Sequence, residues 1–158
     1  MTQTKASQLP SVTIIRKIKA PPAKVYAALT QPEQMLLWWG PDAGPTLKAE
    51  ADVRVGGRLS VVFRTLNGQE HNPTGVYREV VPDRKLVFTW EWAGAPERES
   101  LVTFLLQPID GGTQLTLIHA QLPDEEARNS HEQGWSGLLD KLPVFLGVEG
   151  QGDRKWAN

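Results

Sequence analysis

Apolar and polar residues alternate along much of the first 120 positions, and a period of two residues predicts β-strands. Glycine, proline and asparagine separate the alternating runs, as in Gly56-Gly57, Asn67-Gly68 and Pro82-Asp83, so consecutive runs are expected to pair as antiparallel hairpins. The runs predicted as strands are 11–20, 47–55, 58–66, 74–81, 85–92, 98–107 and 113–121.

Three segments follow the helical period instead. Pro22 suits the first turn of a helix over 22–30, and a short helix is expected over 33–38, ended by Gly40-Pro41. A longer helix is expected to begin near Asp124. After Gly134 it carries an apolar stripe at helical spacing: Trp135, Leu138, Leu139, Leu142, Phe145 and Leu146. Pro143 lies within this helix and predicts a kink or an early end there.

The order of these elements predicts an α+β fold: one strand, two short helices, about six more antiparallel strands, and one long helix. A lone amphipathic helix needs a sheet against which to bury its stripe, so we expect a curved sheet wrapped around it. At 158 residues the chain is expected to form one domain, over 11–148. Residues 1–10 and 149–158 are expected to be flexible tails.

Composition excludes several classes of function. The formal net charge is −1 with no basic face, which argues against nucleic acid and anionic membranes as partners. No apolar stretch approaches the roughly 20 residues that span a bilayer, and the first ten residues lack the apolar core of a signal peptide. The chain has no cysteine, so a cytoplasmic location is expected.

Several short sequences in this order resemble the helix-grip superfamily, also called Bet v 1-like, START-like or SRPBCC. Within it, the chain is similar to the homologues of the activator of the heat-shock protein 90 ATPase, the AHSA1-like proteins. The similarity covers about residues 12–146. The matching segments are 20–30, Trp38-Trp39-Gly40-Pro41, 52–58, 75–82, 86–90, 115–119 and Gly134-Trp135.

The resemblance implies a helix-grip fold of about six to seven strands with a cavity between sheet and helix. The first function it suggests is binding of a small hydrophobic or amphipathic molecule, such as a lipid. A second is a co-chaperone or stress-response interaction protein with a chaperone as partner. A third is a polyketide-cyclase-like enzyme that uses His119 or Tyr77 as general acid or base; the chain is expected more readily to be a binding protein than an enzyme.

Four aromatic residues are expected around the cavity: Trp39, Phe63, Trp90 and Trp135. The alternative is that these rings fill the core and leave no space for a ligand. Leu138, Leu139 and Leu142 are expected to form the helical wall, and Tyr77 is a further candidate.

His119 shares a strand face with Leu115 and Leu117, which places an imidazole on an otherwise apolar wall. It is expected either to orient a ligand or to be a core histidine bonded to a neighbouring strand or to Tyr77, and the second interpretation is favoured.

Other chemistry has little support. His71, His119 and His131 are the only histidines, and no two have metal-ligand spacing on a common element, so no metal is expected. Ser136 lacks the flanking glycines of a nucleophile elbow. The glycine pairs sit between strands rather than before helices, so no phosphate-binding loop and no cofactor are expected. No catalytic residue is assigned, and either a monomer or a homodimer is compatible with the sequence.

Overall fold

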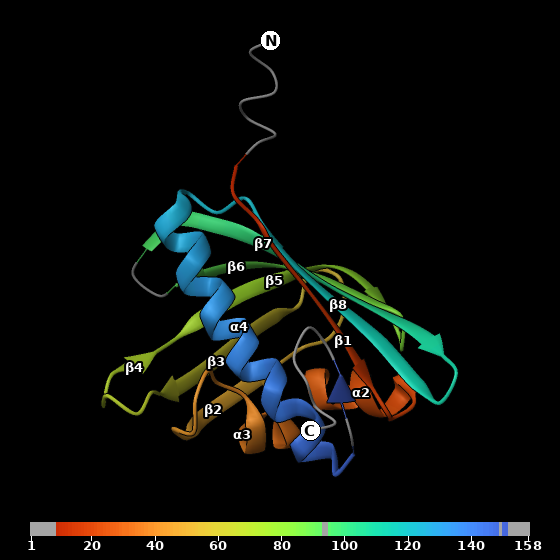
Figure 1. Cartoon of the computed structure of the whole chain (residues 1–158). Coiled ribbons are helices and arrows are strands. Elements are labelled where there is room, and N and C mark those ends of the chain that lie inside the picture. The colour runs from red at the N-terminus through yellow and green to blue at the C-terminus, as the bar shows by residue number, and fades with distance from the viewer. Residues whose placement is uncertain (1–8, 93–94, 149, 152–158) are drawn as a thin grey trace.

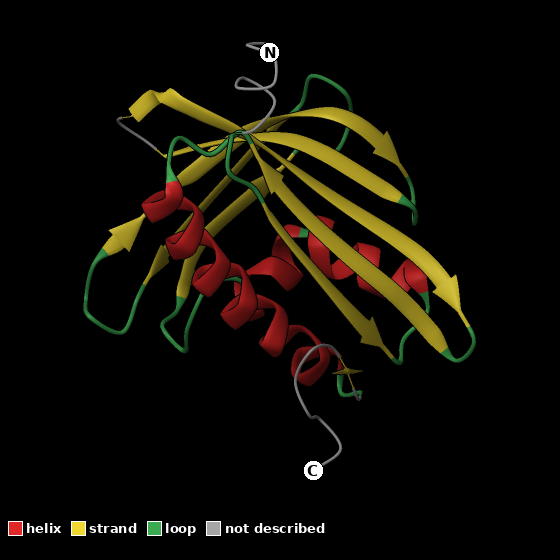
Figure 2. Ribbon diagram, turned by 45° about the horizontal axis from the view of Figure 1, so that its top comes forward, coloured by secondary structure: helices red, strands yellow, loops and turns green. Residues whose placement is uncertain are grey.

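The computed structural model describes residues 9–92, 95–148 and 150–151. One antiparallel sheet curves around a single long helix, as Figures 1 and 2 show. The strand order is β2-β3-β5-β6-β7-β8-β1-β9, and β4 pairs with β3 beside this path. The strands are β1 (Val12–Ile18), β2 (Thr46–Ala51), β3 (Arg58–Arg64), β4 (Glu70–His71), β5 (Pro73–Val81), β6 (Lys85–Trp92), β7 (Ala95–Ile109), β8 (Gly112–Ala120) and β9 (Gly150–Gln151).

Two short helices, α2 (Pro22–Thr30) and α3 (Pro32–Trp38), follow β1 directly. Each begins with proline, whose fixed φ and missing N–H suit the first helical turn. Buried side chains of α2 and α3, among them Val25, Leu29 and Met35, join the core. The two helices therefore close one end of the curved sheet, beside the C-terminal half of the long helix (Figure 1).

Helix α4 (Glu125–Leu146) lies along the concave face of the sheet (Figure 1). Asp124 caps its first turn by accepting a hydrogen bond from the Ala127 N–H at 2.8 Å. Gly147 ends it in the left-handed conformation, with φ of 71°. Pro143 is buried inside the helix, which continues through it to Leu146, so the early end expected from the sequence does not occur.

The core lies between the concave face of the sheet and α4. Inward-facing positions of β1 and β8 alternate strictly with exposed or half-buried ones. They supply apolar side chains such as Ile14, Leu115 and Leu117, which pack with Leu139 and Leu142 of α4. Burial of this apolar surface from both elements is the main force that holds the helix in the sheet.

The helix-grip architecture predicted from the sequence is confirmed, including the two short helices and the long C-terminal helix. Two additional strands, β4 and β9, have only two residues each, too few to produce an alternating pattern. Most residues of the two predicted tails, 1–10 and 149–158, lie outside the described residues. Within the second segment, Gly150 and Gln151 pair with β1. No helix within the described residues is long and apolar enough to span a membrane.

Candidate functional site

A pocket of about 450 Å³ opens between the first half of α4, the segment that follows α3, and strands β3, β4 and β6. Its walls are mainly aromatic. The rings are those of Trp39, Phe63, His71, Trp90, Trp92 and Trp135. The polar side chains at the pocket belong to Asp42, Thr65, Ser130, His131 and Gln133. Apolar walls with a few polar groups are typical of sites for small organic ligands.

The indole rings of the pocket contact one another. The ring centroids of Trp90 and Trp135 lie 5.0 Å apart, and those of Trp90 and Trp92 lie 5.6 Å apart in an edge-to-face arrangement. Trp39 meets Trp135 edge-on at 6.2 Å. Such contacts hold each ring in a single orientation, so the aromatic wall is formed before any ligand arrives.

A chain of hydrogen bonds behind the wall fixes Trp135 to the sheet. The Trp135 indole N–H donates to Nδ1 of His119 at 2.9 Å. Nδ1 must therefore be unprotonated, so the neutral imidazole carries its proton on Nε2 and donates it to the Ser100 hydroxyl at 2.7 Å. Ser100 in turn donates to the carbonyl oxygen of Trp90 at 3.2 Å. The chain thus joins α4, β8, β7 and β6, and both nitrogens of His119 are used.

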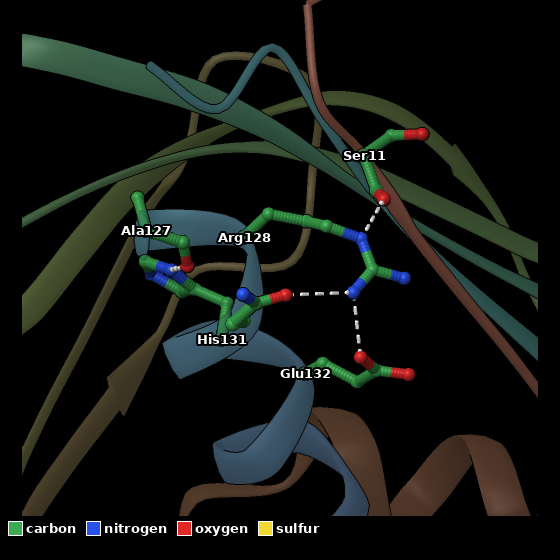
Figure 3. A network of polar contacts seen from close by, with 6 residues as sticks. Ser11, Ala127, Arg128, His131 and Glu132 are labelled. Atoms are coloured by element: carbon green, nitrogen blue, oxygen red, sulfur yellow. Dashed lines mark hydrogen bonds and ion pairs between the residues drawn. The ribbon is translucent and has the colours of Figure 1, made fainter. Parts of the chain in front are cut away.

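His131 lies at the pocket and is held in a similar way. Its Nε2 accepts a hydrogen bond from the Trp92 indole N–H at 3.3 Å, so its Nδ1 carries the proton and donates to the Ala127 carbonyl at 2.7 Å (Figure 3). The rings of His119 and His131 meet edge-to-face, with centroids 4.7 Å apart. Two histidines 12 positions apart in sequence are therefore packed together in neutral form.

Burial keeps both imidazoles neutral. Loss of solvent, together with a smaller effect of the neighbouring His131, lowers the pKa of His119 to about 3. Burial also lowers the pKa of His131, against the opposing effect of its hydrogen bond to the Ala127 carbonyl. Neither group therefore adds positive charge to the pocket near neutral pH.

The first turns of α4 are anchored to the start of β1 through Arg128. Its Nε donates to the Ser11 carbonyl at 3.0 Å, and its Nη1 forms an ion pair with Glu132 at 2.6 Å (Figure 3). Asn129 accepts a further hydrogen bond from Nη1 at 3.1 Å. His131 lies within the same turns, so this anchor also positions the helical side of the pocket.

The segment after α3 forms the rim and packs closely on α4. A Cβ atom on Gly137 would overlap the carbonyl oxygen of Pro41, so only glycine allows this approach. Lys141 donates to the Asp42 carbonyl at 2.6 Å. The Asp42 carboxylate accepts backbone N–H bonds from Gly44 at 2.8 Å and from Leu66 at 3.1 Å, which joins the rim to the β3–β4 turn.

This fold and pocket can now be compared with known proteins. Residues 19–147 match the family described as "Activator of Hsp90 ATPase homolog 1-like protein". The chain belongs to this family. No protein with a curated description matches it.

Solved structures support the assignment. An AHSA1 protein from Silicibacter pomeroyi is 29% identical, with a TM-score of 0.77; the match covers 87% of this chain and 98% of that one. A protein from Chromobacterium violaceum is 28% identical, also with a TM-score of 0.77, over 85% of this chain and 94% of that one. The family and the helix-grip fold agree with the resemblance noted in the sequence.

In this member of the AHSA1-like family, several residues expected around the cavity line the pocket. They are Trp39, Phe63, Trp90, Trp135 and Leu138. The same four rings, Trp39, Phe63, Trp90 and Trp135, are almost fully buried and belong to the hydrophobic core, and the pocket opens beside them. Whether a ligand contacts these residues stays a prediction.

The other expected residues do not line this pocket. Both nitrogens of His119 are bonded to Ser100 and Trp135 behind the wall, which agrees with the favoured interpretation of a core histidine. Tyr77 packs on Phe88, and its pKa is raised by burial and by the nearby Tyr26 and Asp52, away from the aromatic wall. Leu139 and Leu142 are buried in the core. They face the sheet because they occupy the other side of the helical stripe.

Sequence reasoning missed Trp92, His71, His131 and Asp42. Two of them carried a usable signal: Trp92 is two residues from Trp90 on one strand, and His131 is four residues before Trp135 on one helix. His71 and Asp42 lie in irregular or very short segments, where no periodicity identifies the buried side.

Within the described residues, no group of three His, Cys, Asp or Glu side chains is arranged to hold a metal ion. His119 and His131 come closest together, but all four of their ring nitrogens already take part in hydrogen bonds. Metal binding there would require breaking bonds that hold two pocket indoles in place.

Proposed function

We propose that this protein binds a small hydrophobic or amphipathic molecule in the aromatic pocket. The observation that carries the proposal is an open space of about 450 Å³ whose indole rings are fixed from behind by hydrogen bonds. Binding to a rigid apolar wall is favourable because apolar surface leaves water. Little conformational entropy is lost, since the rings are already held in place. The proposal includes a cytoplasmic location, in keeping with a chain that has no cysteine.

The side chains considered as acid or base in the sequence are not placed for catalysis at this pocket. The two side chains considered as acid or base, His119 and Tyr77, do not line the pocket. His131 does, but its nitrogens are engaged with Trp92 and Ala127. General acid–base catalysis needs a proton-transfer group within hydrogen-bond reach of the substrate.

The test is native mass spectrometry of the purified protein after incubation with a lipid and metabolite extract. We expect a bound species of discrete mass that disappears when the pocket is filled by the Gly134→Leu substitution. The control is Glu126→Leu, which places the same side chain at an exposed position of α4 away from the pocket lining. Retention of the same species by the filled variant, or its absence from the wild type, would contradict the proposal.

A second candidate is a role as a co-chaperone, which family membership alone favours. Its test is the ATPase rate of the cognate heat-shock protein 90 with and without saturating amounts of this chain. A stimulated rate supports that function, and an unchanged rate argues against it.

A further inference from the structure

The side chains that line the pocket carry an uneven charge. Asp42 is the only aspartate or glutamate among them, and the lining contains no lysine or arginine. The same lining includes four tryptophans and one phenylalanine. Aromatic faces are electron-rich and attract cations.

The Asp42 carboxylate is held in place by backbone hydrogen bonds. Its two oxygens accept hydrogen bonds from the backbone N–H groups of Gly44 and Leu66, which orient it but carry no formal charge. Lys141 bonds to the backbone carbonyl of Asp42 and attracts the nearby carboxylate, but among the described residues no cationic side chain forms an ion pair with it. Each oxygen retains lone pairs for a further partner.

His119 and His131 do not offset this negative charge. His131 has a proton on Nδ1 only, because Nε2 accepts the Trp92 N–H, and His119 lies behind the wall in neutral form. The indole N–H groups of Trp92 and Trp135 are used in these hydrogen bonds, whereas the buried Nε1 of Trp90 has no partner among the described residues. The site therefore combines aromatic rings with one carboxylate.

We propose that the pocket selects a flat organic cation, such as an aromatic ammonium ion, which stacks on the indoles and is attracted by Asp42. This inference rests on the proposed binding function and specifies its ligand class. The aromatic wall and the carboxylate together recognise the positive charge, while the flat apolar part of the ligand occupies the pocket beside Trp39, Trp90 and Trp135.

The experiment compares three probes of matched shape by isothermal titration calorimetry at pH 7.5. They are N-methylquinolinium, which is a cation, 4-methylquinoline, which is neutral at this pH, and quinoline-4-carboxylate, which is an anion. We expect the cation to bind about tenfold more tightly than the neutral probe, and the anion to bind most weakly. A neutral probe that binds as tightly as the cation, or no binding by any probe, overturns the proposal.

The Asp42→Asn variant separates charge from shape. It should lower the affinity for the cation about tenfold more than the affinity for the neutral probe, whose continued binding shows that the pocket is intact. An equal loss of affinity for both probes, or no loss of affinity for the cation, contradicts a role for the carboxylate. If the neutral probe binds with the same affinity as the cation, the proposed cation selectivity is wrong but the proposed binding function is not. The native mass spectrometry experiment tests the binding function independently.

Discussion

The indole N–H of Trp135 reaches Nδ1 of His119 across 2.9 Å, and through this contact the middle of α4 is tied to strand β8. The same imidazole continues to Ser100 and hence to the Trp90 carbonyl. The residue that looked most like a catalytic group in the sequence therefore serves to hold the aromatic wall. Its importance should be visible in stability rather than in turnover.

Replacement of His119 by phenylalanine should lower the free energy of unfolding by about 2–3 kcal/mol. The substitution keeps an aromatic ring but leaves the Trp135 N–H and the Ser100 hydroxyl without their partner in a dry environment. Urea denaturation followed by far-UV circular dichroism measures the loss. His71→Phe is the control, since His71 is half-buried with no comparable hydrogen bond, and it should cost less than about 1 kcal/mol. Similar losses in both variants would argue against the network.

Acid should destabilise the protein through the same histidine. Its pKa is about 3 in the folded state, below the roughly 6.5 of an unfolded histidine, so the unfolded chain binds more protons between these values. The stabilising contribution is complete above about pH 6.5 and is lost as the pH falls toward 3. Between pH 6 and pH 4 we expect a loss of about 2 kcal/mol from this group. His131, whose pKa is also lowered, adds a loss of the same sign.

Urea denaturation at a series of pH values measures this dependence. The His119→Phe variant should show a shallower fall in stability over the same interval, because it lacks the titrating group. A wild-type profile that is flat from pH 6 to pH 4 would contradict the assignment.

Two glycines of α4 provide a matched pair of substitutions. Gly137→Ala should destabilise by about 1–3 kcal/mol, because its Cβ overlaps the Pro41 carbonyl and the rim must move away. Gly134→Ala should stabilise by up to about 1 kcal/mol, since its Cβ meets only Pro41 Cβ at 3.8 Å and alanine favours the helix. Thermal unfolding by calorimetry distinguishes the two, and effects of the same sign would contradict this account of the rim.

Gly134 also allows the pocket to be filled without harm to the fold. A leucine there extends from α4 into the space that Gly134 and Pro41 border. We expect Gly134→Leu to abolish binding of 4-methylquinoline while the thermal midpoint stays equal to or above that of the wild type. Calorimetric titration and thermal unfolding measure the two quantities. Unchanged affinity would show that the ligand binds elsewhere.

The sequence predicted the fold well because its elements have clear periods. Strict alternation in β1 and β8 and the stripe from Trp135 to Leu142 fix which faces meet. The pocket was harder to predict because it depends on short or irregular segments: β4 carries His71, and the rim carries Asp42. The partnership of His119 with Trp135 follows from how the helix lies against the sheet, and no local pattern records that geometry.

The contact between neighbouring indoles has an optical consequence. Trp90 lies 5.0 Å from Trp135 and 5.6 Å from Trp92, so their electronic transitions couple rather than absorb independently. Circular dichroism should therefore contain an exciton signal that comes from the binding wall itself. A guest that packs against the rings would alter this signal, so occupancy of the pocket could be followed without an attached dye.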